Sequence, residues 1–184
     1  VILGNGRFYT MRQNYKPYKI PTFGYPKLRL NLIIEYTDGS RQTIASDISW
    51  KLTTEGPIRS NNEYDGEEYD ARKELGDWNR TGYDDTNWIP AGRVSIPSGT
   101  LRAQMMPGMK VTESLKPVSI RKQGDKHILD IGQNMAGWLR IRIKGQAGDS
   151  IRLRFAERLQ ADGEIFTKNL RDAHCTDIYV VSGR

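Results

Sequence analysis

The chain has 184 residues, enough to bury a hydrophobic core and to form one large or two small domains. Its hydrophobic fraction of 37% is ordinary for a globular protein, and no apolar run approaches the roughly 20 residues of a membrane span, so we expect no membrane partner. The single cysteine, Cys175, excludes a disulfide within the chain, and the net charge of +6 comes from the second half, because residues 1–92 carry 12 basic and 13 acidic groups.

The first strand signal lies in residues 27–36, where polar and apolar residues alternate and place three leucines on one face. The turn residues at 37–40 predict a hairpin, with residues 41–45 as the returning strand. Trp50 follows and is the predicted core anchor of this part of the chain.

An acidic stretch at residues 59–72 packs five carboxylates, two adjacent amides and two tyrosines around one turn glycine, Gly66. Oxygen-bearing side chains at that density, beside flat rings, suit a sugar hydroxyl or a hard cation. The same composition also fits a solvated acidic loop between two strands. Both interpretations stay open at the level of composition.

Residues 74–88 combine aromatic residues with Gly, Asp and Asn at short intervals, which predicts an irregular loop packed on a sheet. Trp78, Tyr83 and Trp88 could stack on sugar rings, although loop aromatics more often serve packing. Lys116 and Pro117 mark the boundary at which we expect a second unit to begin.

The second unit is predicted to be built from strands. Residues 138–144 and 150–155 alternate apolar with basic residues, which predicts strands with one buried face and one basic, solvated face. Residues 176–181 form the final predicted strand, which has no evident partner and is expected to be an open edge. No helical period lasts three turns, so we predict a nearly all-β fold.

The sequence offers little for catalysis. His127 and His174 lack the glycine-rich elbow of a hydrolytic triad. Paired carboxylates in residues 59–72 could serve a glycosidase, but neighbouring carboxylates in one loop more often hold a cation or water. The basic strands carry no alternating rings for base stacking, so we expect no nucleic-acid partner. From the residues alone, a hydrolytic triad is disfavoured, and the acidic stretch stays open as a candidate carboxylate pair or cation site.

Two groups of motifs resemble the non-catalytic β-domains of bacterial α-L-rhamnosidases. The first group resembles the latter part of the family's N-terminal sandwich and includes Tyr64-Asp-Gly-Glu67, Tyr69-Asp-Ala-Arg72 and Asp84-Asp-Thr-Asn-Trp88. The second group resembles the sandwich that follows and includes Gly132-Gln-Asn-Met-Ala-Gly-Trp138, Arg154-Phe-Ala-Glu157 and Thr176-Asp-Ile-Tyr179. The resemblance implies two antiparallel, jelly-roll-like β-sandwich units, each incomplete, in residues 1–116 and, with a concanavalin-like fold, in residues 117–184.

The resemblance also implies an activity, the hydrolysis of terminal α-L-rhamnose from plant glycosides or pectic polysaccharides with inversion at the anomeric carbon. In the family this chemistry belongs to an (α/α)₆ barrel elsewhere in the polypeptide, so the resemblance implies that this chain contains no catalytic residue. We therefore expect this chain to be inactive alone, and to have rhamnose-containing glycans and the catalytic barrel domain of the same polypeptide as partners. A periplasmic or secreted location is expected, and the absence of an initiator Met indicates a piece of a longer protein.

Two roles remain open for such a piece. It is a scaffold that also serves as a carbohydrate-binding module, or it is a purely structural interdomain module with no ligand, its acidic loop fixed by arginines such as Arg59 and Arg72. In some members of the family the N-terminal sandwich binds rhamnose through a Ca²⁺ ion. The polar pair that precedes the Tyr-Asp-Gly-Glu motif falls here on Asn61 and Asn62, where an aspartate would be a stronger ligand.

The resemblance thus gives two sets of candidate residues. The candidate Ca²⁺ ligands are Asn61, Asn62 and Asp65. The candidate sugar-binding residues are Asn61, Asn62, Tyr64, Asp65, Glu67, Asp70, Trp78 and Trp88.

Overall fold

The computed structural model describes residues 1–9, 23–96, 98–100 and 102–183. The chain forms two compact units, each assembled from stretches that are separated in the sequence. The first unit comprises Val1–Ile96, Gly145–Arg154 and Asp172–Arg184, and the second comprises Pro97–Lys144 and Phe155–Arg171. The domain boundary expected between residues 116 and 117 stays a prediction.

The first hairpin of the first unit pairs β1 (Asn31–Glu35) with β2 (Arg41–Ala45) in antiparallel register. Its turn is fixed locally, because a carboxylate oxygen of Asp38 accepts a hydrogen bond of 2.8 Å from the backbone N–H of Ser40. The hairpin predicted from the turn residues is therefore confirmed.

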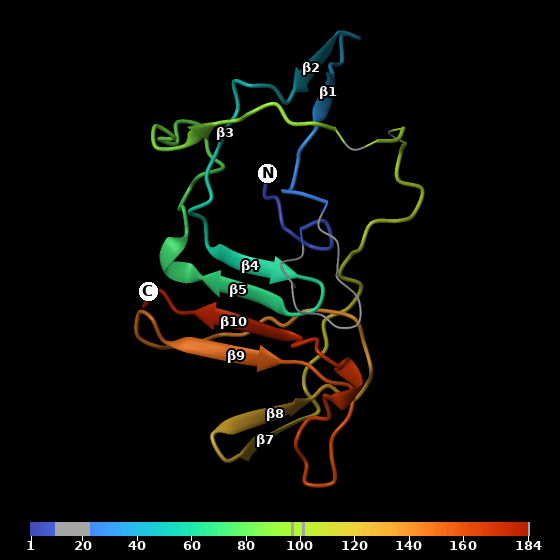
Figure 1. Cartoon of the computed structure of the whole chain (residues 1–184), viewed down its shortest axis with the longest axis vertical. Coiled ribbons are helices and arrows are strands. Elements are labelled where there is room, and N and C mark those ends of the chain that lie inside the picture. Colours follow the sequence, from blue (N-terminus) through green and yellow to red (C-terminus); the bar gives the residue numbers. More distant parts are fainter. Residues whose placement is uncertain (10–22, 97, 101, 184) are drawn as a thin grey trace. The chain divides into compact units, whose positions relative to one another are not determined.

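A four-stranded sheet organises the first unit, with its strands in the order β4, β5, β10, β9 (Figure 1). The hairpin of β4 (Ile58–Asn62) and β5 (Gly66–Asp70) is antiparallel, β10 (Thr176–Val180) lies parallel to β5, and β9 (Ser150–Arg154) closes the sheet antiparallel to β10. The prediction that the last strand is an open edge is wrong. Alternation along a strand indicates its two faces but carries no information about its partner.

Of the two strands that were predicted to carry a basic face, the structure contains one. In β9, Ile151 and Leu153 are half-buried while Arg152 and Arg154 are exposed, which confirms the alternation. Residues 138–144 form no strand, so that prediction is wrong. Alternation makes a segment suited to a sheet, but a strand also needs a hydrogen-bonded neighbour, and among the described strands none pairs with this segment.

The buried centre of the first unit lies where β5 ends. The two-residue strands β3 (Lys51–Leu52) and β6 (Ile89–Pro90) pair with each other, and the 3₁₀ turn η1 (Ala71–Lys73) follows β5 directly. Among the described hydrophobic side chains, Ala71 and Val181 are the buried ones, 1% and 7% exposed. Trp50, the predicted core anchor, lies next to β3, is half-buried and is not among these buried side chains.

The second unit holds one antiparallel hairpin, β7 (Ser119–Gln123) with β8 (Lys126–Asp130), and the 3₁₀ turn η2 (Lys168–Leu170). The hairpin contacts a turn of the same unit. Arg121 donates to the carbonyl oxygen of Gly163, and the side-chain amide of Gln123 donates to the carbonyl oxygen of Asp162 at 3.2 Å.

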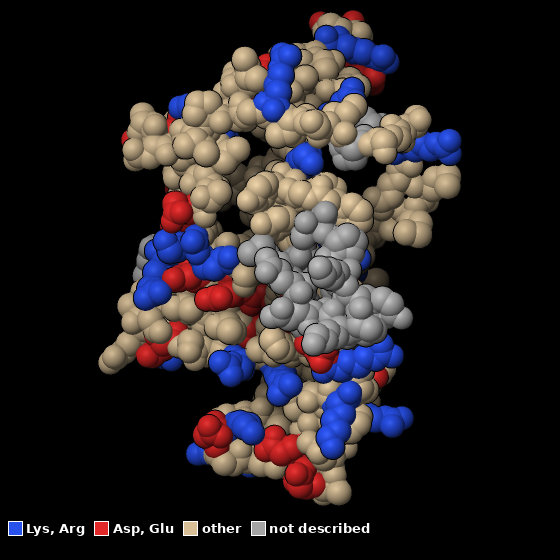
Figure 2. Space-filling model, in the orientation of Figure 1, with Lys and Arg blue, Asp and Glu red and all other residues tan. Residues whose placement is uncertain are grey.

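The fold class is confirmed as all-β, with mainly antiparallel pairing and the parallel pair of β5 and β10 as an addition that the sequence did not indicate. No helix among the described residues is long and apolar enough to cross a membrane. On the face drawn in Figure 2, Lys and Arg side chains lie among Asp and Glu side chains. Exposed ion pairs such as Lys51 with Asp85, at 2.7 Å, contribute at most about 1 kcal/mol each to the free energy of unfolding.

Candidate functional site

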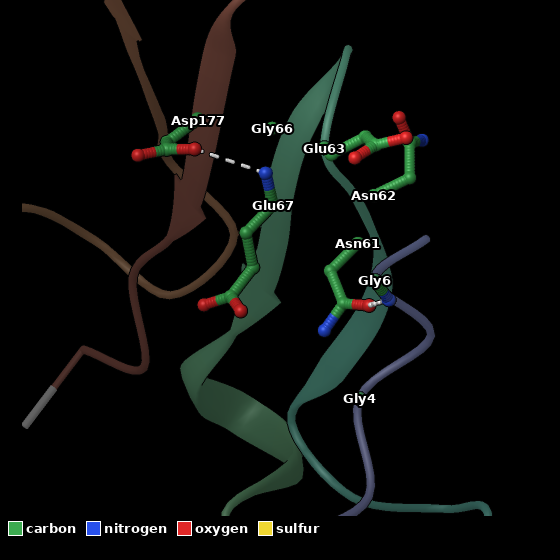
Figure 3. Close-up of a pocket in the computed structure, with 8 residues that line it drawn as sticks. All are labelled: Gly4, Gly6, Asn61, Asn62, Glu63, Gly66, Glu67 and Asp177. Carbon is green, nitrogen blue, oxygen red and sulfur yellow. Dashed lines mark hydrogen bonds between the residues drawn. The ribbon is translucent and has the colours of Figure 1, made fainter. Parts of the chain in front are cut away.

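A solvent-open depression of about 470 Å³ lies in the first unit, beside the ends of β4, β5 and β10 (Figure 3). Its volume falls within the roughly 300–1,000 Å³ of pockets that bind small molecules. The residues that line it come from three stretches of the chain and are Gly4, Gly6, Asn61, Asn62, Glu63, Gly66, Glu67 and Asp177.

The tip of the β4–β5 hairpin is held by the side chain of Asn62. Its amide oxygen accepts hydrogen bonds of 2.9 Å from the backbone N–H groups of Tyr64 and Asp65, and its amide nitrogen donates to Asp65 Oδ2 at 3.1 Å. A side chain that binds the backbone two and three residues ahead stabilises a tight turn. The turn delivers Gly66 to the rim of the depression.

Gly66 is required where β10 passes. Its φ of +104° belongs to a region that residues with a Cβ rarely adopt, and a Cβ at this position would lie 2.2 Å from the carbonyl oxygen of Thr176. The backbone N–H of Thr176 in turn donates to the carbonyl oxygen of Asp65 at 2.8 Å. The close approach of the two backbones therefore depends on the absence of a side chain.

Asp177 enters the site from β10. Its Oδ1 accepts a hydrogen bond of 2.9 Å from the backbone N–H of Glu67, across 110 residues of sequence (Figure 3). Near the same end of the sheet, His174 Nδ1 lies 3.2 Å from Asp65 Oδ1. These contacts fix the start of β10 against the hairpin tip and set the carboxylate of Asp177 beside Glu67.

The N-terminal segment supplies the remaining wall. Asn61 Oδ1 accepts hydrogen bonds from the backbone N–H groups of Asn5, at 2.7 Å, and Gly6, at 3.4 Å. Figure 3 draws the hydrogen bond from Gly6. Arg7 Nε lies 2.9 Å from Glu63 Oε1. Both contacts hold residues 4–7 against the end of β4.

Asp70, a predicted sugar-binding residue, has an internal role. The residue is 6% exposed, and its carboxylate accepts hydrogen bonds from the backbone N–H of Arg72 at 3.0 Å and from Arg72 Nε and Nη2 at 2.9 and 2.8 Å. These hydrogen bonds, with the guanidinium charge, lower the pKa of the Asp70 carboxyl to about 2. The bidentate pair locks η1 onto the end of β5.

Tyr69 and Tyr179 form an aromatic pair on the same sheet. Their rings stack with centroids 5.6 Å apart, and the Tyr69 hydroxyl donates to Glu74 Oε1 at 3.0 Å. Burial, followed by the hydrogen bond to Glu74, raises the pKa of Tyr69 to about 12.

The predicted sugar-binding residues are distributed over three places. Asn61, Asn62 and Glu67 line the depression, and Tyr64 and Asp65 form the hairpin tip beside it. The remaining three lie outside the lining: Asp70 pairs with Arg72, Trp78 is half-buried in the loop after η1, and Trp88 packs edge-on against Tyr83 with ring centroids 5.8 Å apart.

Sequence reasoning missed the lining residues that come from elsewhere in the chain. Gly4, Gly6 and Asp177 lie more than 50 residues from the hairpin in sequence, and no local pattern marks them as its neighbours. Glu63 and Gly66 lay within the acidic stretch but had been assigned no ligand role. For Asp177 the missing signal was the pairing of β10 with β5, and for Gly4 and Gly6 it was the contact of the N-terminal segment with Asn61.

The candidate Ca²⁺ ligands do not fit a cation as they are arranged here. A Ca²⁺ ion takes six to eight oxygen ligands, and an amide oxygen has two lone pairs. The side-chain oxygens of Asn61 and Asn62 each accept two backbone N–H groups, and the two oxygens of Asp65 face Asn62 and His174. Among the described residues there is also no group of three or more His, Cys, Asp or Glu side chains placed to hold a metal ion.

The chain matches two family descriptions. Residues 1–113 match the family described as "Alpha-L-rhamnosidase N-terminal domain", and residues 120–184 match the family described as "Bacterial alpha-L-rhamnosidase concanavalin-like domain". The depression combines residues of both matched regions, because Asp177 lies in the second and the other lining residues lie in the first.

Individual relatives agree with this assignment. An α-L-rhamnosidase of Streptomyces avermitilis is 40% identical over 169 residues, which is 86% of this chain and 16% of the relative, and one of Formosa agariphila is 37% identical over 158 residues, covering 85% and 17%. A structure of the α-L-rhamnosidase from Dictyoglumus thermophilum superposes with a TM-score of 0.85 and 36% identity over 98% of this chain and 20% of that one. The crystal structure of the Streptomyces avermitilis enzyme complexed with L-rhamnose superposes with a TM-score of 0.78 and 38% identity, covering 84% and 15%.

This chain therefore spans roughly a sixth of the length of the curated relatives that it matches, and within that span it belongs to the α-L-rhamnosidase family.

Proposed function

We propose that this chain is a non-catalytic β-portion of an α-L-rhamnosidase and that the depression in its first unit binds a terminal L-rhamnose residue. The observation that carries the proposal is the depression itself, whose volume of about 470 Å³ is combined with carboxylate and amide side chains and with glycine backbone. Sugars are bound by such convergent polar groups, which accept and donate hydrogen bonds to hydroxyls.

The chemistry of the lining suits a neutral sugar. The Glu67 and Asp177 carboxylates can accept hydrogen bonds from sugar hydroxyls, and charge-assisted hydrogen bonds of this kind are about twice as strong as neutral ones. Gly4 and Gly66 also line the depression, next to these polar side chains. The crystal structure of the Streptomyces avermitilis relative contains L-rhamnose, which supports this choice of sugar.

For the whole protein we propose hydrolysis of terminal α-L-rhamnose from plant glycosides or pectic polysaccharides, carried out by a catalytic barrel domain of the same polypeptide. The names of the relatives support this activity, and the chain covers 15–20% of the solved structures that it resembles. In this proposal the present chain supplies a scaffold and a sugar site, and it does not turn over rhamnosides alone.

The test is calorimetric titration of the 184-residue chain with L-rhamnose, with D-mannose as the control sugar, in buffers with Ca²⁺ and with a chelator. We expect heat with L-rhamnose in both buffers. The isosteric variants Glu67→Gln and Asp177→Asn should each weaken binding by about tenfold, whereas Glu113→Gln, which changes an exposed carboxylate of the second unit, should leave it unchanged. The absence of heat and of any thermal shift with L-rhamnose would refute the sugar site.

A second candidate function is a structural module that binds nothing. It is favoured by the internal use of the acidic stretch, since Asp70 is engaged by Arg72 and the guanidinium of Arg59 donates to the carbonyl oxygens of Thr54 and Gly56 at 3.2 and 3.1 Å. Under this alternative neither the native chain nor Glu67→Gln would give titration heat with L-rhamnose. The sugar would also leave the melting temperature of both proteins unchanged.

A further inference from the structure

We propose that Asn61 is a positioning residue, which builds the sugar site by holding residues 4–7 in place as its wall and does not itself contact the sugar. This inference rests on the function proposed above. It assigns to Asn61 a different role from the direct ligand contact expected from the sequence.

The side-chain oxygen of Asn61 is fully used within the protein. It accepts the backbone N–H of Asn5 at 2.7 Å and that of Gly6 at 3.4 Å, across 56 and 55 residues of sequence. An amide oxygen has two lone pairs, so these two donors leave none for a sugar hydroxyl. The amide thus connects the end of β4 with a segment that the sequence places far away (Figure 3).

The fit of the segment against Asn61 is close. A Cβ added at Gly4 would lie 3.0 Å from Asn61 Nδ2, which is tighter than ordinary van der Waals contact. Arg7 provides a second attachment through its ion pair of 2.9 Å with Glu63. The wall is therefore held at Asn61 and at Glu63. Gly4 lets the wall lie this close to Asn61 because it has no side chain.

The consequence for the site is indirect. Gly4 and Gly6 line the depression, so release of the segment would open one side of it without changing Glu67 or Asp177. A variant that loses only the Asn61 oxygen should behave like one in which the wall has moved. The aspartate variant should behave like the native protein, because a carboxylate also accepts two N–H groups.

The first arm of the test needs no sugar. Amide hydrogen exchange of the free 184-residue chain should show faster exchange at Asn5 in Asn61→Ala, by about fivefold or more, and native exchange in Asn61→Asp. Gly92→Ala, which places a Cβ in open space at a residue without positive φ, is the matched control. Native exchange at Asn5 in Asn61→Ala would overturn the proposal.

The second arm measures L-rhamnose binding by calorimetry. Asn61→Ala should weaken binding by about tenfold, and Asn61→Asp should stay within about threefold of the native protein. Gly4→Ala should weaken binding in the native background, yet add nothing in the Asn61→Ala background, because the wall is then already released. Additive effects, or a loss in Asn61→Asp equal to that in Asn61→Ala, would instead show direct contact of Asn61 with the sugar and overturn the proposal.

The two arms separate the failure of this inference from that of the proposed function. If the native chain gives no heat with L-rhamnose, the sugar site is refuted, and the exchange experiment still decides whether Asn61 holds the wall. If the native chain binds and exchange at Asn5 is unaffected by Asn61→Ala, the sugar site stands and the positioning role falls.

Discussion

Tyr69 and Tyr179 stack across the parallel pair of β5 and β10, with their ring planes 5° apart and their centroids 5.6 Å apart. They are direct register partners, although 110 residues separate them. Their contact lies on the same two strands as the hydrogen bond from Glu67 to Asp177, so the stack and the candidate site depend on the same strand pairing. Changes at the tyrosines should therefore report on the stability of the sheet that carries the site.

Tyr69→Phe should change the stability of the protein at alkaline pH. The folded-state pKa of Tyr69 is raised to about 12 from an ordinary value of 10.0, so its contribution is fully present below about pH 10 and is lost as the pH rises through about 12. Phenylalanine keeps the stack but has no hydroxyl to titrate. At pH 7 the variant should lose less than about 1 kcal/mol of unfolding free energy, because the hydrogen bond to Glu74 is exposed to solvent.

Denaturant unfolding at several pH values between 9 and 12 checks this prediction. The free energy of unfolding should fall less steeply in Tyr69→Phe than in the native protein. Glu74→Gln should make the decline smaller and end it at a lower pH, since it removes the carboxylate charge that helps to raise the folded-state pKa of Tyr69. Parallel pH profiles for Tyr69→Phe and the native protein would contradict the assignment.

Asp70→Asn should change stability at acidic pH. The contribution of Asp70 to the free energy of unfolding is lost as the pH falls, whereas that of Tyr69 is lost as the pH rises. The pKa of Asp70 is lowered to about 2 by its hydrogen bonds to Arg72, so the contribution of the pair is present above about pH 4 and is lost as the pH falls through about 2. The asparagine variant should have a lower melting temperature at pH 7, by several degrees, and a flatter melting profile between pH 4 and pH 2. Asp125→Asn, an exposed change in the second unit, should keep both the native melting temperature and the native profile.

Gly66→Ala should be far more damaging than the same substitution at another glycine of positive φ. Both Gly66 and Gly82 have positive φ, +104° and +84°, but a Cβ at Gly82 meets nothing within 4 Å while one at Gly66 would lie 2.2 Å from the Thr176 carbonyl oxygen. Gly82→Ala should lower the free energy of unfolding by about 1 kcal/mol, the usual effect of backbone strain, and Gly66→Ala by clearly more than about 2 kcal/mol. Equal losses in the two variants, measured by denaturant unfolding, would show that β10 does not pass Gly66 as closely as described.

Local chemistry made part of this fold predictable. The turn residues at 37–40 indicated the first hairpin, and the alternation of Ile151 and Leu153 with two arginines indicated β9 and its faces. The motifs around the hairpin tip located three of the eight lining residues, Asn61, Asn62 and Glu67. Each of these features depends on neighbours within a few residues.

Long-range pairing accounts for the parts that were not predicted. Asp177 has no local pattern that connects it with Glu67, because the contact is made only when β10 lies parallel to β5. Residues 138–144 alternate as regularly as β9 but form no strand, since alternation does not supply a hydrogen-bonded partner. The roles of Asn61 and Asp70 were likewise hidden, because both depend on which donors reach their oxygens in the folded chain.

A fragment that ends at residue 116 should lose the candidate site, although the whole N-terminal domain match, residues 1–113, lies within it. Such a fragment keeps the β4–β5 hairpin but lacks β9 and β10, and therefore Asp177 and half of the four-stranded sheet. An isolated two-stranded hairpin is marginally stable in water, so the exchange protection of the β5 amides should collapse and L-rhamnose binding should disappear. Hydrogen exchange and calorimetry on this fragment beside the 184-residue chain provide the measurement. Native exchange protection of the β5 amides in the fragment would contradict this prediction. It would show that the β4–β5 hairpin is stable without its pairing to β10.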